Sequence, residues 1–112
     1  MWYATSGSDS VPPRKRAVRL LGLAERDLSD IYDYIAAENP TAADRLLTRI
    51  EKDLNTLSSQ PMLGRIPRDH DIASIGYRYL VIGDYLAFYR LEPSVVLVQR
   101  ILHGARGYSD IL

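Results

Sequence analysis

The sequence contains no cysteine and only two histidines, His70 and His103. A chain without cysteine cannot form disulfides or thiolate metal sites, and two histidines are too few for a convincing zinc site. We therefore expect no metal ion and no other cofactor.

Long apolar runs are also absent. No run approaches the roughly 20 residues that a membrane-spanning helix needs. The first residues lack the apolar region of a secretory signal peptide, so we expect a cytoplasmic protein with no membrane partner. The 112 residues, 46% hydrophobic and 25% charged, suit one globular domain.

Lysine is scarce as well, with two lysines against twelve arginines. The net charge of zero argues against a protein whose whole surface binds nucleic acid. Residues 24–60 carry eight acids and four bases, whereas the bases of residues 61–112 are six arginines against five acids. Arginine suits bidentate recognition of carboxylates and phosphates, which hints at an anionic partner. Codon bias explains the arginines equally well.

Two amphipathic helices are predicted in the first half of the domain. Residues 1–15 resemble a flexible arm, and residues 16–23 form a short apolar segment that favours a strand. Apolar residues then recur at helical spacing over 24–35 and again over 43–57. Asn39 followed by Pro40 is a strong signal for a helix start. Because almost no loop separates the two helices, they should form an antiparallel hairpin.

Three strands are predicted in the second half, over residues 76–82, 85–91 and 95–102. The turn residues at 83–84 and 92–94 are too few for anything but an antiparallel meander. The predicted fold is therefore α+β, a two-layer sandwich with the order β-α-α-β-β-β, in which the helical hairpin packs on the meander. We expect residues 16–112 to form this single domain.

The order of these elements resembles that of a known toxin family. Four sequence stretches also carry this resemblance: "DLSDIYDYIAAENPTAADRLLTRI", "PMLGR", "GYRYLVIGDYLAFYRL" and "VVLVQRILHGARG". Together they resemble the ParE/RelE superfamily of type II toxin–antitoxin modules, in particular its ParE-like branch, over residues 17–108. The resemblance implies that the N-terminal strand joins the sheet. It also implies a cognate antitoxin that wraps the toxin in a hetero-oligomeric complex and keeps it inactive.

The resemblance leaves two targets open. Members of the RelE branch cut messenger RNA in the ribosome without a metal, whereas ParE-like members are associated with inhibition of DNA gyrase, which needs a binding surface and no catalysis. RelE-type nucleases carry an arginine where this chain has Leu86, and a basic residue where it has Leu80, two residues after Arg78. We therefore favour a non-catalytic gyrase inhibitor over a ribosome-dependent endoribonuclease. A toxin-fold module that only binds an antitoxin is the third interpretation.

The stretch "QRILHGARGY" ends the last predicted strand with ionisable side chains. In a ribonuclease, His103, Arg106 and Tyr108 could be a general base, a phosphate clamp and a second proton-transfer group. In a gyrase inhibitor, Arg106 and Tyr108 would instead form a target-binding surface with Arg65 and Arg78, because arginine and tyrosine dominate interface energies.

Structural roles are alternatives for several of these residues. His103 could cap the strand end, and Arg106 could pair with a helix acid such as Asp27 or Asp30. Otherwise, the acids of the first predicted helix are expected to lie on its solvated surface. Arg65 is likewise expected to lie in a solvated loop. The predicted strands contain four tyrosines, Tyr77, Tyr79, Tyr85 and Tyr89. They could form a stacking platform for bases, but ordinary strand residues are the better interpretation.

Overall fold

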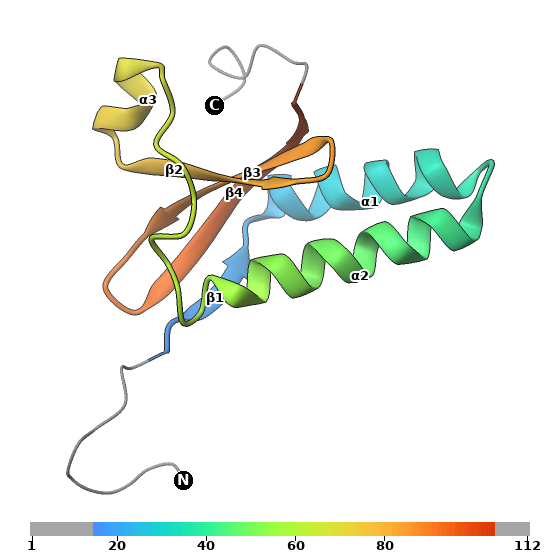
Figure 1. Ribbon diagram of the computed structural model, residues 1–112, viewed down its shortest axis with the longest axis horizontal. Helices are drawn as coiled ribbons and strands as arrows, with labels where there is room; N and C mark the ends of the chain where they lie inside the picture. Colours follow the sequence, from blue (N-terminus) through green and yellow to red (C-terminus); the bar gives the residue numbers. More distant parts are fainter. Residues whose placement is uncertain (1–14, 105–112) are drawn as a thin grey trace, which may run out of the picture.

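The computed structural model describes residues 15–104 and has two layers, a helical hairpin and a four-stranded sheet (Figure 1). The predicted α+β two-layer fold is therefore confirmed. The predicted N-terminal arm lies outside the described residues, apart from Lys15. In chain order the elements are β1 (Ala17–Leu20), α1 (Gly22–Ala36), α2 (Pro40–Thr56), α3 (His70–Ser74), β2 (Tyr77–Ile82), β3 (Tyr85–Leu91) and β4 (Val95–His103).

The helical hairpin forms where the apolar spacing predicted it. The side chain of Asn39 accepts a hydrogen bond from the backbone N–H of Ala42 at 3.1 Å, and Pro40 is the first residue of α2. This cap satisfies a backbone donor that no earlier carbonyl of the helix can reach. The predicted helix start is confirmed, and both helices run on past the end of the sheet (Figure 1).

The sheet has the strand order β1-β4-β3-β2. Strands β2, β3 and β4 form the predicted antiparallel meander, with bounds within one residue of those expected. Gly83, at φ +60°, supplies the left-handed conformation in the β2–β3 turn. Strand β1 pairs with β4 in parallel, starting with Ala17 opposite Val95. The N-terminal strand thus joins the sheet as its outer strand, as the resemblance implied.

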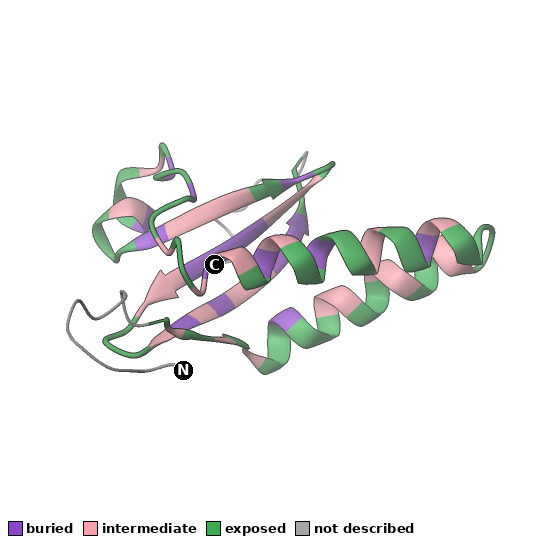
Figure 2. Ribbon diagram, turned by 60° about the horizontal axis from the view of Figure 1, so that its bottom comes forward, coloured by how far each residue is buried: buried purple, intermediate pink, exposed green. Residues whose placement is uncertain are grey.

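The hydrophobic core lies between the hairpin and the sheet, where the buried positions of the helices face the strands (Figure 2). Because one stripe of each helix and one face of the sheet are covered in this way, two layers suffice to remove these apolar side chains from water. The buried residues of this core are Ala24, Ile50, Leu54, Leu57, Ile82, Ala87, Tyr89, Val96, Val98 and Ile101.

An ion pair holds α1 against the part of β4 that β1 does not cover. The carboxylate of Asp27 accepts hydrogen bonds from Arg100 Nε at 2.7 Å, Arg100 Nη2 at 2.9 Å and the backbone N–H of Ile101 at 3.0 Å. The expectation that Asp27 lies on a solvated helix surface was wrong, because its side chain is only 14% exposed and pairs with Arg100. The alternative partner, Arg106, lies outside the described residues.

The connection between α2 and β2 contains α3, a helix that was not predicted from the sequence. Five residues are too few to show a helical period. The side chain of Asp69 accepts hydrogen bonds from the backbone N–H groups of Asp71 and Ile72, and so caps this short helix. Within residues 15–104, no helix is long and apolar enough to cross a membrane.

Candidate functional site

The last strand ends at His103, opposite the first residue of β3, Tyr85. The two rings meet edge to face, with their centroids 5.5 Å apart and their planes at 82°. The strand end itself is closed by the backbone N–H of Gly104, which donates to the carbonyl of Asp84 at 2.8 Å. His103 is exposed, whereas the predicted residues Arg106 and Tyr108 lie outside the described residues.

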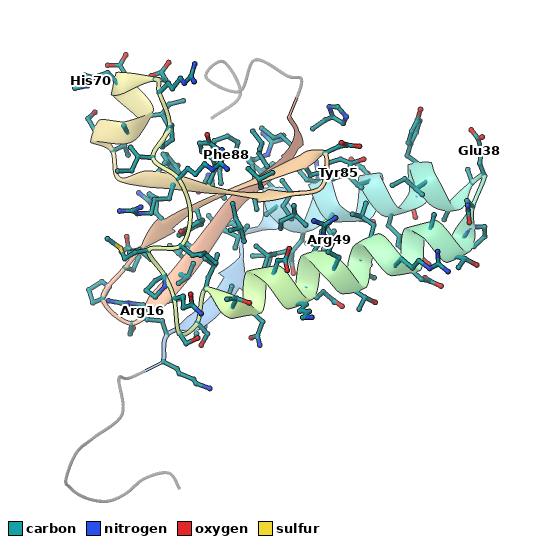
Figure 3. All side chains as sticks on the ribbon, viewed as in Figure 1. Arg16, Glu38, Arg49, His70, Tyr85 and Phe88 are labelled. Carbon is teal, nitrogen blue, oxygen red and sulfur yellow. The ribbon has the colours of Figure 1, made fainter. Side chains whose placement is uncertain are left out.

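Tyr85 stands at the β2–β3 turn (Figure 3) and packs against the edge of the core. Burial, with a smaller contribution from the neighbouring Asp84 carboxylate, raises the pKa of its hydroxyl. The two leucines that replace the bases of a RelE-type nuclease lie nearby in the sheet. Leu80 packs against the core, and the side chain of Leu86 lies beside Gly104. Both positions therefore supply apolar surface.

Arg78 is directed at the chain segment that precedes α3. Its Nη1 donates to the carbonyl of Gly64 at 2.9 Å, with a longer contact of 3.4 Å to the carbonyl of Met62. Arg65 lies in the same segment, and its backbone pairs with Tyr79 through N–H···O bonds of 2.7 and 2.8 Å. The structure thus brings the predicted residues Arg65 and Arg78 together.

The strand end at His103 is separate from that pair. Arg78 is opposite Tyr89 and His103 is opposite Tyr85, four residues apart on β3. At about 3.4 Å per residue, this is about 14 Å along the strand. The predicted target-binding residues therefore divide between two places, of which only the one with Arg65 and Arg78 lies wholly within the described residues.

Tyr89 anchors this segment from the core. Its fully buried hydroxyl accepts a hydrogen bond from the N–H of Gly64 at 2.8 Å and donates one to the carbonyl of Pro61 at 2.8 Å. Burial raises the pKa of Tyr89, although the Gly64 N–H partly opposes that shift. A Cβ atom at Gly64 would lie 2.5 Å from the Tyr89 hydroxyl oxygen, so only glycine fits there. We call residues 61–68 the anchored loop.

The anchored loop exposes large apolar side chains. Met62 is 60% exposed, Leu63 49% and Ile66 61%. Two exposed arginines, Arg65 and Arg68, alternate with them, and residues 61–68 contain no acid. Sequence reasoning found Arg65 in "PMLGR" but missed Tyr89 as the anchor, because nothing local to either segment links residues 25 positions apart.

The four strand tyrosines do not form a stacking platform. Tyr89 is fully buried, and Tyr85 packs against the core beneath the helices. Tyr79 packs on Phe88 with ring centroids 5.7 Å apart, and Tyr77 is 9% exposed. The interpretation as ordinary strand residues is therefore the one that the structure supports.

A second surface lies beside the outer strand β1. It is a groove of about 490 Å³ between the two helices and Leu20, and an adjoining hollow of about 190 Å³ extends it along β1 and α2. Two exposed acids, Glu25 and Glu51, stand among its lining residues, so we call it the acidic groove. Its apolar lining residues are Val18, Leu20, Leu28, Leu47 and Leu54.

Comparison with known proteins finds one family. Residues 18–108 match the ParE toxin of the type II toxin–antitoxin system parDE. Over 81 residues, which are 71% of this chain and 85% of the relative, the sequence is 33% identical to Toxin RelE2 of Caulobacter vibrioides.

Two solved structures share the fold. The chromosomal ParDE toxin–antitoxin system of P. aeruginosa aligns with a TM-score of 0.68 and 20% identity, covering 80% of this chain and 97% of the other. The toxin–antitoxin complex RelBE2 of Mycobacterium tuberculosis aligns with a TM-score of 0.56 and 24% identity, covering 80% and 98%. At these identities the likeness concerns the fold alone.

Proposed function

The chain belongs to the ParE toxin family of type II toxin–antitoxin systems, and on that premise we propose that it poisons DNA gyrase by binding it, without catalysing a reaction. A cognate antitoxin neutralises the toxin in a hetero-oligomeric complex. Both proteins act in the cytoplasm, where gyrase works.

One observation supports a binding function over catalysis: all three arginines on β2, β3 and β4 already contact protein groups. Arg78 donates to loop carbonyls, Arg100 pairs with Asp27, and Arg90 lies over the ring of Tyr77, 5.7 Å from its centroid. Metal-independent cleavage of RNA needs cations aimed at the scissile phosphate. Arg78 and Arg100 are hydrogen-bonded within the fold and are therefore poorly placed for that task, whereas the Nε of Arg90 is buried without a hydrogen-bond partner.

Ribosome-dependent cleavage of messenger RNA is the second candidate. The contact between the exposed His103 and Tyr85 favours it, since an imidazole beside a phenol offers two groups that can move protons. In that case His103 would be the general base, and Arg106 and Tyr108 would complete the site. The chain is 33% identical to Toxin RelE2, so the experiment below also measures cleavage of messenger RNA.

The acidic groove is the surface that best fits the antitoxin. Strand β1 is the last strand of the sheet on that side, and an outer strand can accept a further strand from another chain. The apolar lining suits an amphipathic segment, and Glu25 and Glu51 favour basic residues on it. With this surface uncovered, the toxin should be poorly soluble on its own.

The experiment that tests the proposal follows supercoiling and transcripts together after the toxin is expressed. We expect supercoiling to fail while messenger RNA stays intact, and His103→Ala to remain toxic. Transcripts cut at codon boundaries before supercoiling changes would contradict the proposal. So would a loss of roughly two to four orders of magnitude in cleavage rate in His103→Ala, the contribution expected of a general base.

A further inference from the structure

We propose that the anchored loop, residues 61–68, is the surface through which the toxin contacts its protein target. The target would present an apolar pocket flanked by carboxylates. This inference rests on the proposed function, because it requires a protein target, but it names a contact surface that the family assignment does not specify.

Hydrogen bonds from the sheet hold the backbone of the anchored loop at Pro61, Gly64 and Arg65. The Tyr89 hydroxyl bonds both Pro61 and Gly64, and Arg78 bonds Gly64 from the neighbouring strand. The backbone of Arg65 is paired with Tyr79 in both directions. A segment that is ordered before binding loses little conformational entropy on binding, which is what a high-affinity contact requires.

This framework presents large apolar side chains to solvent. Met62, Leu63 and Ile66 are each about half exposed or more, although a loop that merely linked α2 to α3 could carry polar residues at these positions. Single exposed apolar residues are ordinary, but three within five positions form a patch of the kind that marks an interaction site. Methionine adapts well to irregular partner surfaces.

The anchored loop and the acidic groove carry opposite charges. Arg65 and Arg68 make the anchored loop cationic, whereas Glu25 and Glu51 make the acidic groove anionic. A basic antitoxin segment that suits the groove is repelled by the loop, so the loop stays available for a partner with carboxylates. The loop itself contains no aromatic residue, and base stacking on aromatic rings is the usual means of binding single-stranded nucleic acid. A protein is therefore the favoured partner.

The experiment uses the full chain with Met62→Ser and Ile66→Ser combined. We expect the concentration that half-inhibits purified gyrase to rise at least tenfold, while the melting temperature and the affinity for the antitoxin stay unchanged. The matched control is Ile75→Ser, since Ile75 is 59% exposed but lies outside the loop. Arg65→Glu should weaken inhibition further, and more strongly at low salt, if the partner is acidic.

The outcomes separate the inference from the function on which it rests. If the wild-type chain does not inhibit gyrase, the proposed function fails, and toxicity in cells of the same variants still tests the loop. Full activity of the Met62/Ile66 variant overturns the inference. An equal loss in Ile75→Ser, or a loss of antitoxin binding in place of target binding, overturns it as well.

Discussion

The anchored loop and the acidic groove lie at opposite edges of one sheet. At the β2 edge the chain supplies its own covering segment, since Arg65 pairs with Tyr79. At the β1 edge no strand within residues 15–104 pairs with the outer side of β1, although Ser58 hydrogen-bonds the backbone of Arg16 just before that strand, and a groove lies between β1 and the helices. An edge strand that is already paired is held in place. An unpaired edge strand has free N–H and C=O groups that can pair with a strand of another chain. This difference is the basis on which we propose the first surface for the target and the second for the antitoxin.

The ion pair between Asp27 and Arg100 joins α1, which lines one side of the acidic groove, to β4. Asp27→Ala would leave the largely buried guanidinium of Arg100 without its partner, so we expect the free energy of unfolding to fall by about 3 kcal/mol. Urea denaturation measures this change. Asp30→Ala is the control, because Asp30 is exposed on the same helix and should change stability by no more than about 0.5 kcal/mol. Equal effects would mean that the pair does not hold the layers together.

The anchored loop can be broken at its closest contact. Gly64→Ala places a methyl group against the Tyr89 hydroxyl and the backbone carbonyl of Tyr79, and overpacking of this kind costs about 2 kcal/mol. We expect lower stability and weaker gyrase inhibition together. Gly22→Ala meets nothing within 4 Å and should leave both unchanged. A Gly64→Ala chain of wild-type stability would show that the loop is not anchored.

The acidic groove can be altered without touching the loop. Reversing both acids, Glu25→Lys with Glu51→Lys, should weaken antitoxin binding about tenfold, or about 1.4 kcal/mol. Isothermal titration measures the affinity, and gyrase inhibition by the same protein should not change. If these reversals leave the affinity for the antitoxin unchanged, the charge difference between the two surfaces does not determine where the antitoxin binds.

The smallest expected effect is a dependence on alkaline pH. The pKa of Tyr89 is raised in the folded chain, so the unfolded chain ionises this tyrosine first. Stability from Tyr89 is therefore fully present below about pH 10 and is lost as the pH rises from there toward the raised folded pKa, with a slope of at most about 1.4 kcal/mol per pH unit. Tyr89→Phe should flatten that decline in chemical denaturation series at increasing pH. An unchanged decline would exclude Tyr89 as its source.

Local patterns sufficed to predict the helices and the meander. The cap at Asn39 and the turn at Gly83 act on their immediate neighbours, and apolar spacing reports burial one element at a time. The pairs that define the site are different, because each joins distant segments: Asp27 with Arg100, and Gly64 with Tyr89. No periodicity encodes such partners.

The structure shows where the predicted residues Arg65, Arg78 and His103 lie, whereas their roles in binding or catalysis stay predictions. The residue types at Arg65 and Arg78 pointed to a binding surface, but that Arg78 holds the loop from the adjacent strand depends on the tertiary fold. The roles of Arg106 and Tyr108 stay predictions. Whether His103 serves catalysis is a question for the His103→Ala variant.

Gyrase poisoning is tested most directly by adding the purified chain to DNA gyrase in a supercoiling reaction without ribosomes. We predict inhibition that saturates near one toxin per binding site on the enzyme, because a toxin that acts as proposed would occupy a surface and would not turn over. The contradicting result is full supercoiling at a large excess of toxin, from a preparation that cleaves messenger RNA when ribosomes are supplied.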